Sequence, residues 1–287
     1  MKICVLGLDG ATPEIFQDER LANIRRLMDM GVYGKLKTIA QAGTVPIWMS
    51  MGSSQAEAVD AKSMAIWTLL GDNENRAALI GLISDLPPYE VNGVSFASFP
   101  PPPNTPVTET IPESVTDPSP HSLTNQVSLA SRTRWQTARS LFSQQRWAYF
   151  QVVDLGLQTF AVDSADPQAI SHYHLWLDEQ VGSMLELLDD ETLLLIVSPR
   201  GMGPSAEPDG DGMFVLIAPN CPLSGEYQGA TLLDMAPTML DLVGRDIPSS
   251  MQGKSLVAQM QKKGPDAGAD IDEDALLRDR LAGLGYI

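Results

Sequence analysis

Short apolar runs alternate along the chain with longer segments in which apolar residues recur every three or four positions. The short runs predict buried strands, and the periodic segments predict amphipathic helices. The predicted strands are 2–8, 77–83, 147–153, 192–198 and 214–218. The predicted helices are 13–31, 63–70, 129–144, 171–188 and 232–243. This alternation favours an α/β fold with a mainly parallel central sheet.

Prolines are concentrated in one stretch of the chain. Ten of the 21 prolines lie between Pro87 and Pro120. Because proline fixes its own φ and has no N–H donor, a central helix or strand is excluded there. We expect a surface excursion at about 87–120. The strand–helix alternation resumes unchanged after it, which favours one domain, 1–287, over two domains joined by a linker. An acidic helix at about 270–284 is predicted at the C-terminal end.

The charge balance excludes several classes of partner. The chain has 36 Asp and Glu against 19 Lys and Arg, a formal net charge of −17. This charge repels phosphate backbones and anionic lipids, so we expect neither nucleic acid nor a membrane as partner. Two cysteines cannot build a disulfide framework, and the N-terminal apolar run, which ends at Asp9, is short for a signal peptide. We therefore expect a cytoplasmic protein.

Two predicted strands end at an aspartate: Asp9 follows 2–8, and Asp154 follows 147–153. Ligand sites of open α/β sheets lie beyond the carboxyl ends of strands, so the two carboxylates could converge on one crevice. Converging carboxylates repel each other unless a cation, a proton or a basic side chain joins them. Taken alone, each aspartate is better explained as a helix cap or turn residue. Because two strands end this way, a shared ligand site and two separate cap or turn residues explain the pair of aspartates equally well.

Nine short segments follow one another in order over nearly the whole chain. They are 6–12 (LGLDGAT), 23–28 (NIRRLM), 31–36 (GVYGKL), 44–48 (TVPIW), 65–70 (AIWTLL), 87–93 (PPYEVNG), 234–240 (DMAPTML), 251–254 (MQGK) and 280–286 (RLAGLGY). In this order and spacing they resemble the type I phosphodiesterase/nucleotide pyrophosphatase branch of the alkaline phosphatase superfamily. The resemblance implies an alkaline-phosphatase-like three-layer sandwich, with helices on both faces of the sheet.

The resemblance also implies a site with two metal ions and a hydroxyl nucleophile. In the family pattern Asp9 would bind one metal, Thr44 would be the nucleophile on that metal, and Asp154 would bind the second metal. A metal lowers the pKa of a bound hydroxyl, and two metals stabilise charge on the attacking and leaving oxygens. On local sequence alone, Thr44 is better explained as a loop residue before Val45 and Pro46.

The chain departs from the family pattern at the other ligand positions. Gln158 stands where the pattern has a histidine, and 199–201 read Pro-Arg-Gly in place of Asp-His-Gly, which puts Arg200 at a ligand position. The last histidine of the pattern has no counterpart in 207–212 (EPDGDG). We interpret all three histidines of the chain as surface residues: His121, His172 and His174.

Too few ligands remain for a zinc-type site, which takes four. Glu207, Asp209 and Asp211 could offer oxygens to a hard ion such as Mg²⁺ or Ca²⁺, although a solvated acidic turn explains them better. We therefore expect no cofactor; if there is one, it is zinc or another divalent metal.

Arg200 suggests what replaced the metal. A guanidinium there could neutralise the two aspartates, since unpaired buried charges are costly, but the side chain could equally point to solvent. We expect a non-catalytic protein with a binding or regulatory role, whose partner is an unidentified protein or a small phosphate-containing ligand. Two alternatives stay open. One is a metal-dependent phosphodiesterase or phosphatase that uses Thr44 with a rearranged or single-metal site, and the other is a structural or assembly protein.

Overall fold

The structure, a computed structural model, describes residues 1–39, 47–56, 65–71, 76–81, 91–96, 123–144, 146–157, 167–201 and 210–263. The predicted acidic helix at 270–284 and most of the proline-rich stretch lie outside these residues. No helix in the described ranges is both long and apolar enough to cross a lipid bilayer.

One mixed sheet forms the centre of the molecule. Its strands are β1 (Lys2–Leu8), β2 (Val32–Lys37), β3 (Arg76–Ile80), β4 (Gly93–Phe96), β5 (Trp147–Asp154), β6 (Thr192–Ser198), β7 (Gly212–Ile217), β8 (Gly225–Glu226) and β9 (Ala230–Thr231). The order is β4-β3-β5-β1-β6-β7-β2-β8, with β9 paired to β2. β7 pairs antiparallel with both of its neighbours, and every other pairing is parallel. The predicted α/β fold with a mainly parallel sheet is confirmed.

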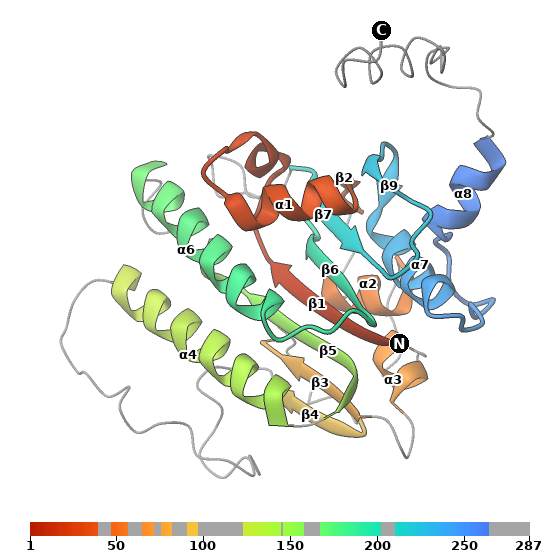
Figure 1. Cartoon of the computed structure of the whole chain (residues 1–287), viewed down its shortest axis with the longest axis horizontal. Coiled ribbons are helices and arrows are strands. Elements are labelled where there is room, and N and C mark those ends of the chain that lie inside the picture. The colour runs from red at the N-terminus through yellow and green to blue at the C-terminus, as the bar shows by residue number, and fades with distance from the viewer. Residues whose placement is uncertain are drawn as a thin grey trace, which may run out of the picture.

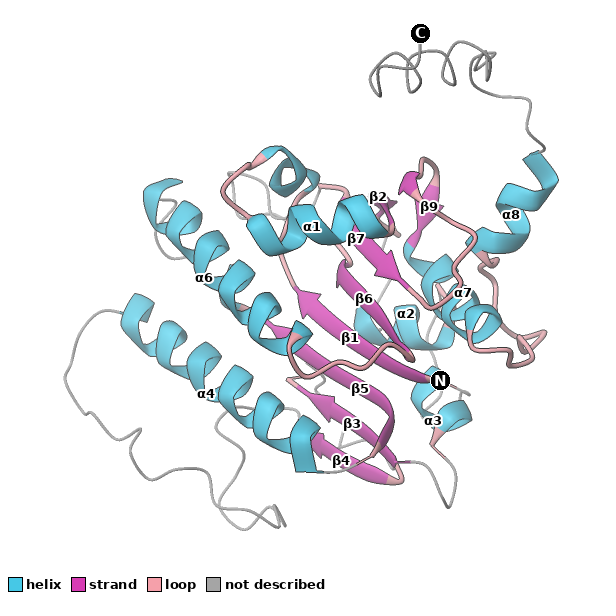
Figure 2. Ribbon diagram, in the orientation of Figure 1, coloured by secondary structure: helices cyan, strands magenta, loops and turns pink. Residues whose placement is uncertain are grey.

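Helices cover both faces of the sheet (Figure 1). One face carries α1 (Ala22–Met30), α4 (Leu123–Gln144) and α6 (Pro167–Leu185), and the other carries α2 (Ile47–Ser53), α3 (Ile66–Leu70), α7 (Met235–Leu242) and α8 (Leu256–Lys263). Successive strand residues point to opposite faces, so Ile3 and Val5 of β1 belong to one core and Cys4 and Leu6 to the other. Figure 2 shows the resulting three layers, with the strands between two sets of helices.

Most predicted elements are present, with shifted ends. The predicted helix 13–31 is divided into a 3₁₀ turn, Pro13–Gln17, and α1. The predicted strand 77–83 already ends at Ile80, because Gly81 follows with a φ of +74° and turns the chain. Within 87–120, residues Gly93–Phe96 form the strand β4 at the edge of the sheet. The prediction excluded only a central strand from this stretch, and an edge strand agrees with it.

Candidate functional site

The parallel pairing of β1 and β5 brings Asp9 and Asp154 together. Leu8 lies opposite Asp154 in the register, and the backbone N–H of Asp9 donates to the carbonyl oxygen of Asp154 at 2.9 Å. Both side chains are buried, with 0% and 1% of the residue exposed. The two strand-end carboxylates therefore lie at one edge of the sheet and inside the protein.

The Asp9 carboxylate has few protein partners. Its Oδ2 accepts one long hydrogen bond, 3.4 Å, from the indole Nε1 of Trp48 on α2. Its Oδ1 lies 3.8 Å from Nε of Arg200, and both of these atoms are buried without a hydrogen-bond partner. Burial raises the pKa of Asp9, while Arg200 and Trp48 lower it and nearby Asp154 raises it further. The net direction is upward, because at this distance the guanidinium does not offset the loss of water.

Hydrogen bonds between two loops hold Arg200 beside Asp9. The side-chain hydroxyl of Ser198, the last residue of β6, accepts a hydrogen bond from the N–H of Gly10 at 3.2 Å and donates to the carbonyl oxygen of Arg200 at 2.7 Å. A β-bridge joins Gly10 to Gly201. The loops after β1 and β6 are thus tied together on both sides of Arg200, and its side chain is only 18% exposed. Arg200 faces the aspartate and does not extend into solvent.

Asp154 has a complete set of partners. Its Oδ1 accepts from the N–H of Gly156 at 2.8 Å and from the hydroxyl of Tyr173 at 2.7 Å. Its Oδ2 accepts from Nε1 of Trp135 at 3.1 Å and lies 3.5 Å from Nη1 of Arg134. Arg134 and Trp135 belong to α4, and Tyr173 belongs to α6. The ion pair is fully enclosed, since the two charged side chains are 7% and 1% exposed.

The sequence patterns did not predict roles for Arg134, Trp135 and Tyr173. The helical periodicity of α4 could have pointed to Arg134. Trp135, Ala138 and Leu141 form the buried apolar side of this helix, and Arg134 lies on the same side. A charged residue at a core position indicates a buried partner, although the sequence does not say which one.

Several of the residues singled out in the sequence are not among those the structure describes: Thr44, Gln158, Glu207, Asp209 and His121. Asp211 and His172 are exposed, and His174 is half-buried on α6, where burial lowers its pKa. Nowhere in the described part of the chain do three or more His, Cys, Asp or Glu side chains come together as metal ligands.

These residues do not fit the two-metal centre implied by the resemblance. Both oxygens of Asp154 already accept protein hydrogen bonds, and a guanidinium faces each aspartate. A divalent cation at either carboxylate would meet a fixed positive charge within a few ångströms. The described residues therefore supply neither the ligands nor the electrostatics of a zinc-type site.

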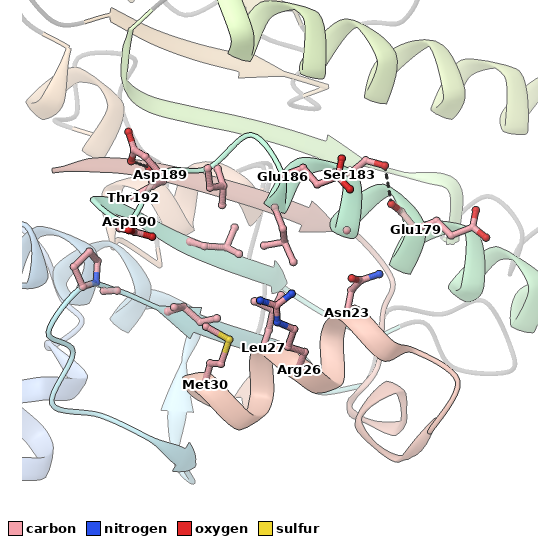
Figure 3. A pocket seen from close by; sticks show the side chains of 17 residues that line it. Asn23, Arg26, Leu27, Met30, Glu179, Ser183, Glu186, Asp189, Asp190 and Thr192 are labelled. Carbon is pink, nitrogen blue, oxygen red and sulfur yellow. Dashed lines mark hydrogen bonds between the residues drawn. The ribbon is translucent and has the colours of Figure 1, made fainter.

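A separate groove of about 680 Å³ lies at the opposite end of β6 (Figure 3). Its floor is apolar, with Leu27 of α1 and Leu194 of β6, and its rim carries Arg26 and Glu186. It reaches β6 at Thr192, the first residue of the strand, whereas Ser198 at the other end contacts the Asp9 loop. The groove thus shares no residue with the aspartate pair.

Comparison with known proteins adds the fold family. No protein-family model and no curated protein matches the chain. A putative sulfatase from Bacteroides thetaiotaomicron superposes with a TM-score of 0.61 over 93% of this chain and 76% of its own, at 13% identity. The chain has the alkaline-phosphatase-like fold.

Two further solved structures have the same fold. The phosphonate monoester hydrolase from Silicibacter pomeroyi gives a TM-score of 0.60 at 12% identity and covers 93% of this chain and 78% of its own. The lipoteichoic acid synthase LtaP from Listeria monocytogenes gives 0.57 at 13% identity, with coverages of 88% and 74%. All three are members of the alkaline phosphatase superfamily, so the predicted three-layer sandwich is confirmed.

Proposed function

We propose that this alkaline-phosphatase-like protein is a non-catalytic member of the type I phosphodiesterase/nucleotide pyrophosphatase-like branch, with a binding or regulatory role. The observation that carries the proposal is the guanidinium of Arg200, held 3.8 Å from the buried carboxylate of Asp9. Arg200 stands at a metal-ligand position of the family pattern. A cationic side chain there supports charge balance by the protein itself.

The second aspartate supports the same proposal independently. Asp154 is surrounded by Arg134, Trp135 and Tyr173, all of which donate to it or pair with it. A carboxylate with these partners is poorly suited to bind a metal that must stabilise a leaving group. We propose a cytoplasmic protein whose partner is another protein or a small phosphate-containing ligand.

One observation favours a second candidate, a phosphoric ester hydrolase with a single metal on Asp9 and Thr44 as nucleophile. Oδ1 of Asp9 accepts no hydrogen bond, so one lone-pair direction of the carboxylate is open. Arg200 opposes a cation there, which makes this candidate the weaker of the two.

Turnover of an aryl phosphodiester separates the two candidates. Purified wild-type protein is assayed with bis(p-nitrophenyl) phosphate in the presence of Zn²⁺ or Mn²⁺, next to a Thr44→Ala variant. The proposal predicts equal background rates for both proteins. Turnover that Thr44→Ala abolishes would establish the hydrolase instead, since only a nucleophile role makes the rate depend on that hydroxyl.

A further inference from the structure

We infer that the groove between α1 and α6 is a docking site for a basic, amphipathic segment of a partner protein. The groove lies at the edge of the sheet where β6 begins, and the aspartate pair lies at the opposite edge (Figure 3). The docking site therefore goes beyond the proposed function and does not depend on the state of Asp9 or Asp154. It gives a chemical character to the protein partner that a binding role requires.

The groove opens where α1 and α6 move apart. At its closed end, Nδ2 of Asn23 on α1 donates to the carbonyl oxygen of Asp178 on α6 at 3.0 Å. Gly182 of α6 faces the same amide, and a Cβ there would lie 2.7 Å from it. The two helices diverge from this contact (Figure 1), and Met30, the last residue of α1, lies at the open end. Leu194 of β6 lines the gap between them, so the groove is a break in the helical layer.

The groove offers apolar surface that a partner can bury. Leu27 and Leu194 close its floor and are only 4% and 3% exposed. Leu188 and Ile217 are partly buried, and Met30 is 59% exposed, more than any other large apolar side chain in the described residues. Apolar surface with a polar rim is typical of protein interaction sites, and methionine is common in them because its side chain is flexible.

The rim of the groove is acidic. Its lining contains Arg26 and four acidic residues: Glu179, Glu186, Asp189 and Asp190. Asp189 forms an ion pair with Lys2 at 2.5 Å. No ion pair within the described residues neutralises the other three carboxylates. Three carboxylates against one guanidinium leave the rim with a net negative charge.

The ends of the two helices add to this negative potential. α1 ends at Met30 and α6 ends at Leu185, and both residues line the groove. The carboxyl end of a helix carries a partial negative charge, which a basic residue in the last turn stabilises. Neither of these last turns contains a basic residue. The potential at the groove therefore favours a cationic partner.

Charge opposes the two occupants that the chain itself could supply. Residues 264–287, which lie outside the described ranges, contain six Asp and Glu and two Arg, so this segment has the same sign of charge as the rim. A second copy would bring its own net charge of −17 to the contact. Like charges disfavour both contacts. Apolar side chains flanked by Lys or Arg match both the floor and the rim.

A fluorescein-labelled model peptide tests the site. The probe is the peptide LKKLLKLLKKLLKL, whose leucines recur at the helical period, and the control is LEELLELLEELLEL, which reverses every charge. Binding is measured by fluorescence anisotropy at physiological ionic strength, where the Debye length is about 8 Å and distant charges are screened. The lysine peptide should bind wild type, and the glutamate peptide should not.

Charge reversals show where the lysine peptide binds. Glu186→Lys with Asp190→Lys reverses two exposed charges on the rim. Asp211→Lys with Asp246→Lys makes the same change in net charge at exposed residues outside the groove. The rim pair should weaken binding about tenfold, which corresponds to about 1.4 kcal/mol over the two reversed charges. The control pair should change binding by less than about twofold, because its charges are screened from the groove.

A second pair of variants tests the apolar contact without changing charge. Met30→Ser removes the exposed apolar side chain at the groove, and Ile247→Ser removes one of 39% exposure elsewhere on the surface. Met30→Ser should weaken binding about fourfold, the effect of losing one buried CH₂ group. Ile247→Ser should leave binding unchanged.

Four results would overturn the docking site. They are no binding of the lysine peptide, equal binding of the glutamate peptide, equal loss of binding in the rim pair and the control pair, and equal loss in Met30→Ser and Ile247→Ser. Sedimentation velocity of wild type examines the second copy, and a dimer that Met30→Ser dissociates would also overturn it. Phosphodiester turnover by wild type would overturn only the proposed function, because the groove lies at the other edge of the sheet.

Discussion

At the scale of single residues, burial and the nearby Arg200 charge shift the pKa of Asp9 in opposite directions. The carboxylate has no exposed surface, and its cation, Arg200, lies at 3.8 Å without a hydrogen bond. Burial is the larger effect and raises the pKa of Asp9. Asp154 meets the same problem with shorter contacts and more donors. Asp9 is therefore the aspartate whose charged form has fewer protein partners.

Asp9→Asn should reveal this through the pH dependence of stability. A carboxyl with a raised pKa keeps its proton in the folded state at pH values where the unfolded chain has lost it. Stability then declines as pH rises from the ordinary carboxyl value, about 4, to the raised one. Asparagine does not titrate. The melting temperature of wild type relative to Asp9→Asn should therefore fall as the pH rises from about 4 to about 7.

The exposed carboxylate variant Asp211→Asn is the control for this series, because it removes one negative charge from the surface. If wild type instead gains stability relative to Asp9→Asn as the pH rises, the pair with Arg200 outweighs burial. The pKa of Asp9 would then be lowered by its surroundings, contrary to the expected rise.

At the scale of elements, the packing of α2 on β1 positions the Trp48 indole next to Asp9. Gly7 makes this packing possible, because a Cβ there would lie 2.5 Å from Cη2 of Trp48. The indole thus covers the strand end and reaches Oδ2 of Asp9. The segments 6–12 and 44–48 of the sequence are therefore linked in the structure by the contact of Trp48 with Gly7 and Asp9.

Gly7→Ala should lower stability by about 1–3 kcal/mol, the usual cost of forcing extra volume into a packed core. The added methyl should also move the indole away from Asp9. Chemical denaturation measures the first effect, and the fluorescence of the tryptophans reports on the second. Gly210→Ala is a fair control, because its Cβ would meet nothing closer than 3.5 Å. Equal stability of the two variants would show that α2 can shift at no cost.

The sequence predicts elements well where the pattern is regular and poorly where it is not. β6, with nearly pure Leu, Ile and Val, has the predicted bounds. β2 was not predicted, since Gly34 and two lysines interrupt its apolar run, and the edge strand β4 lies within a proline-rich stretch. Arg200 was predicted near the aspartates from the family pattern. Arg134 was not, because its partner is 20 residues away in the sequence and only the fold brings them together.

At the scale of the whole molecule, the fold is one shared with hydrolases, whereas the site has arginines beside its two aspartates. The fold is that of the sulfatase, phosphonate monoester hydrolase and LtaP structures, and it puts two aspartates at the carboxyl ends of adjacent strands. The site has a guanidinium against each aspartate. We propose that these arginines supply the charge balance that the resemblance assigns to metal ions.

Zinc stoichiometry tests this claim most directly. Purified wild-type protein is dialysed to equilibrium against a Zn²⁺ buffer, and its bound metal is then measured by elemental analysis. We predict no tightly held zinc, because the arginines and the donors of Asp154 occupy the positions that a metal would need. One or two tightly bound zinc ions per chain would contradict the claim.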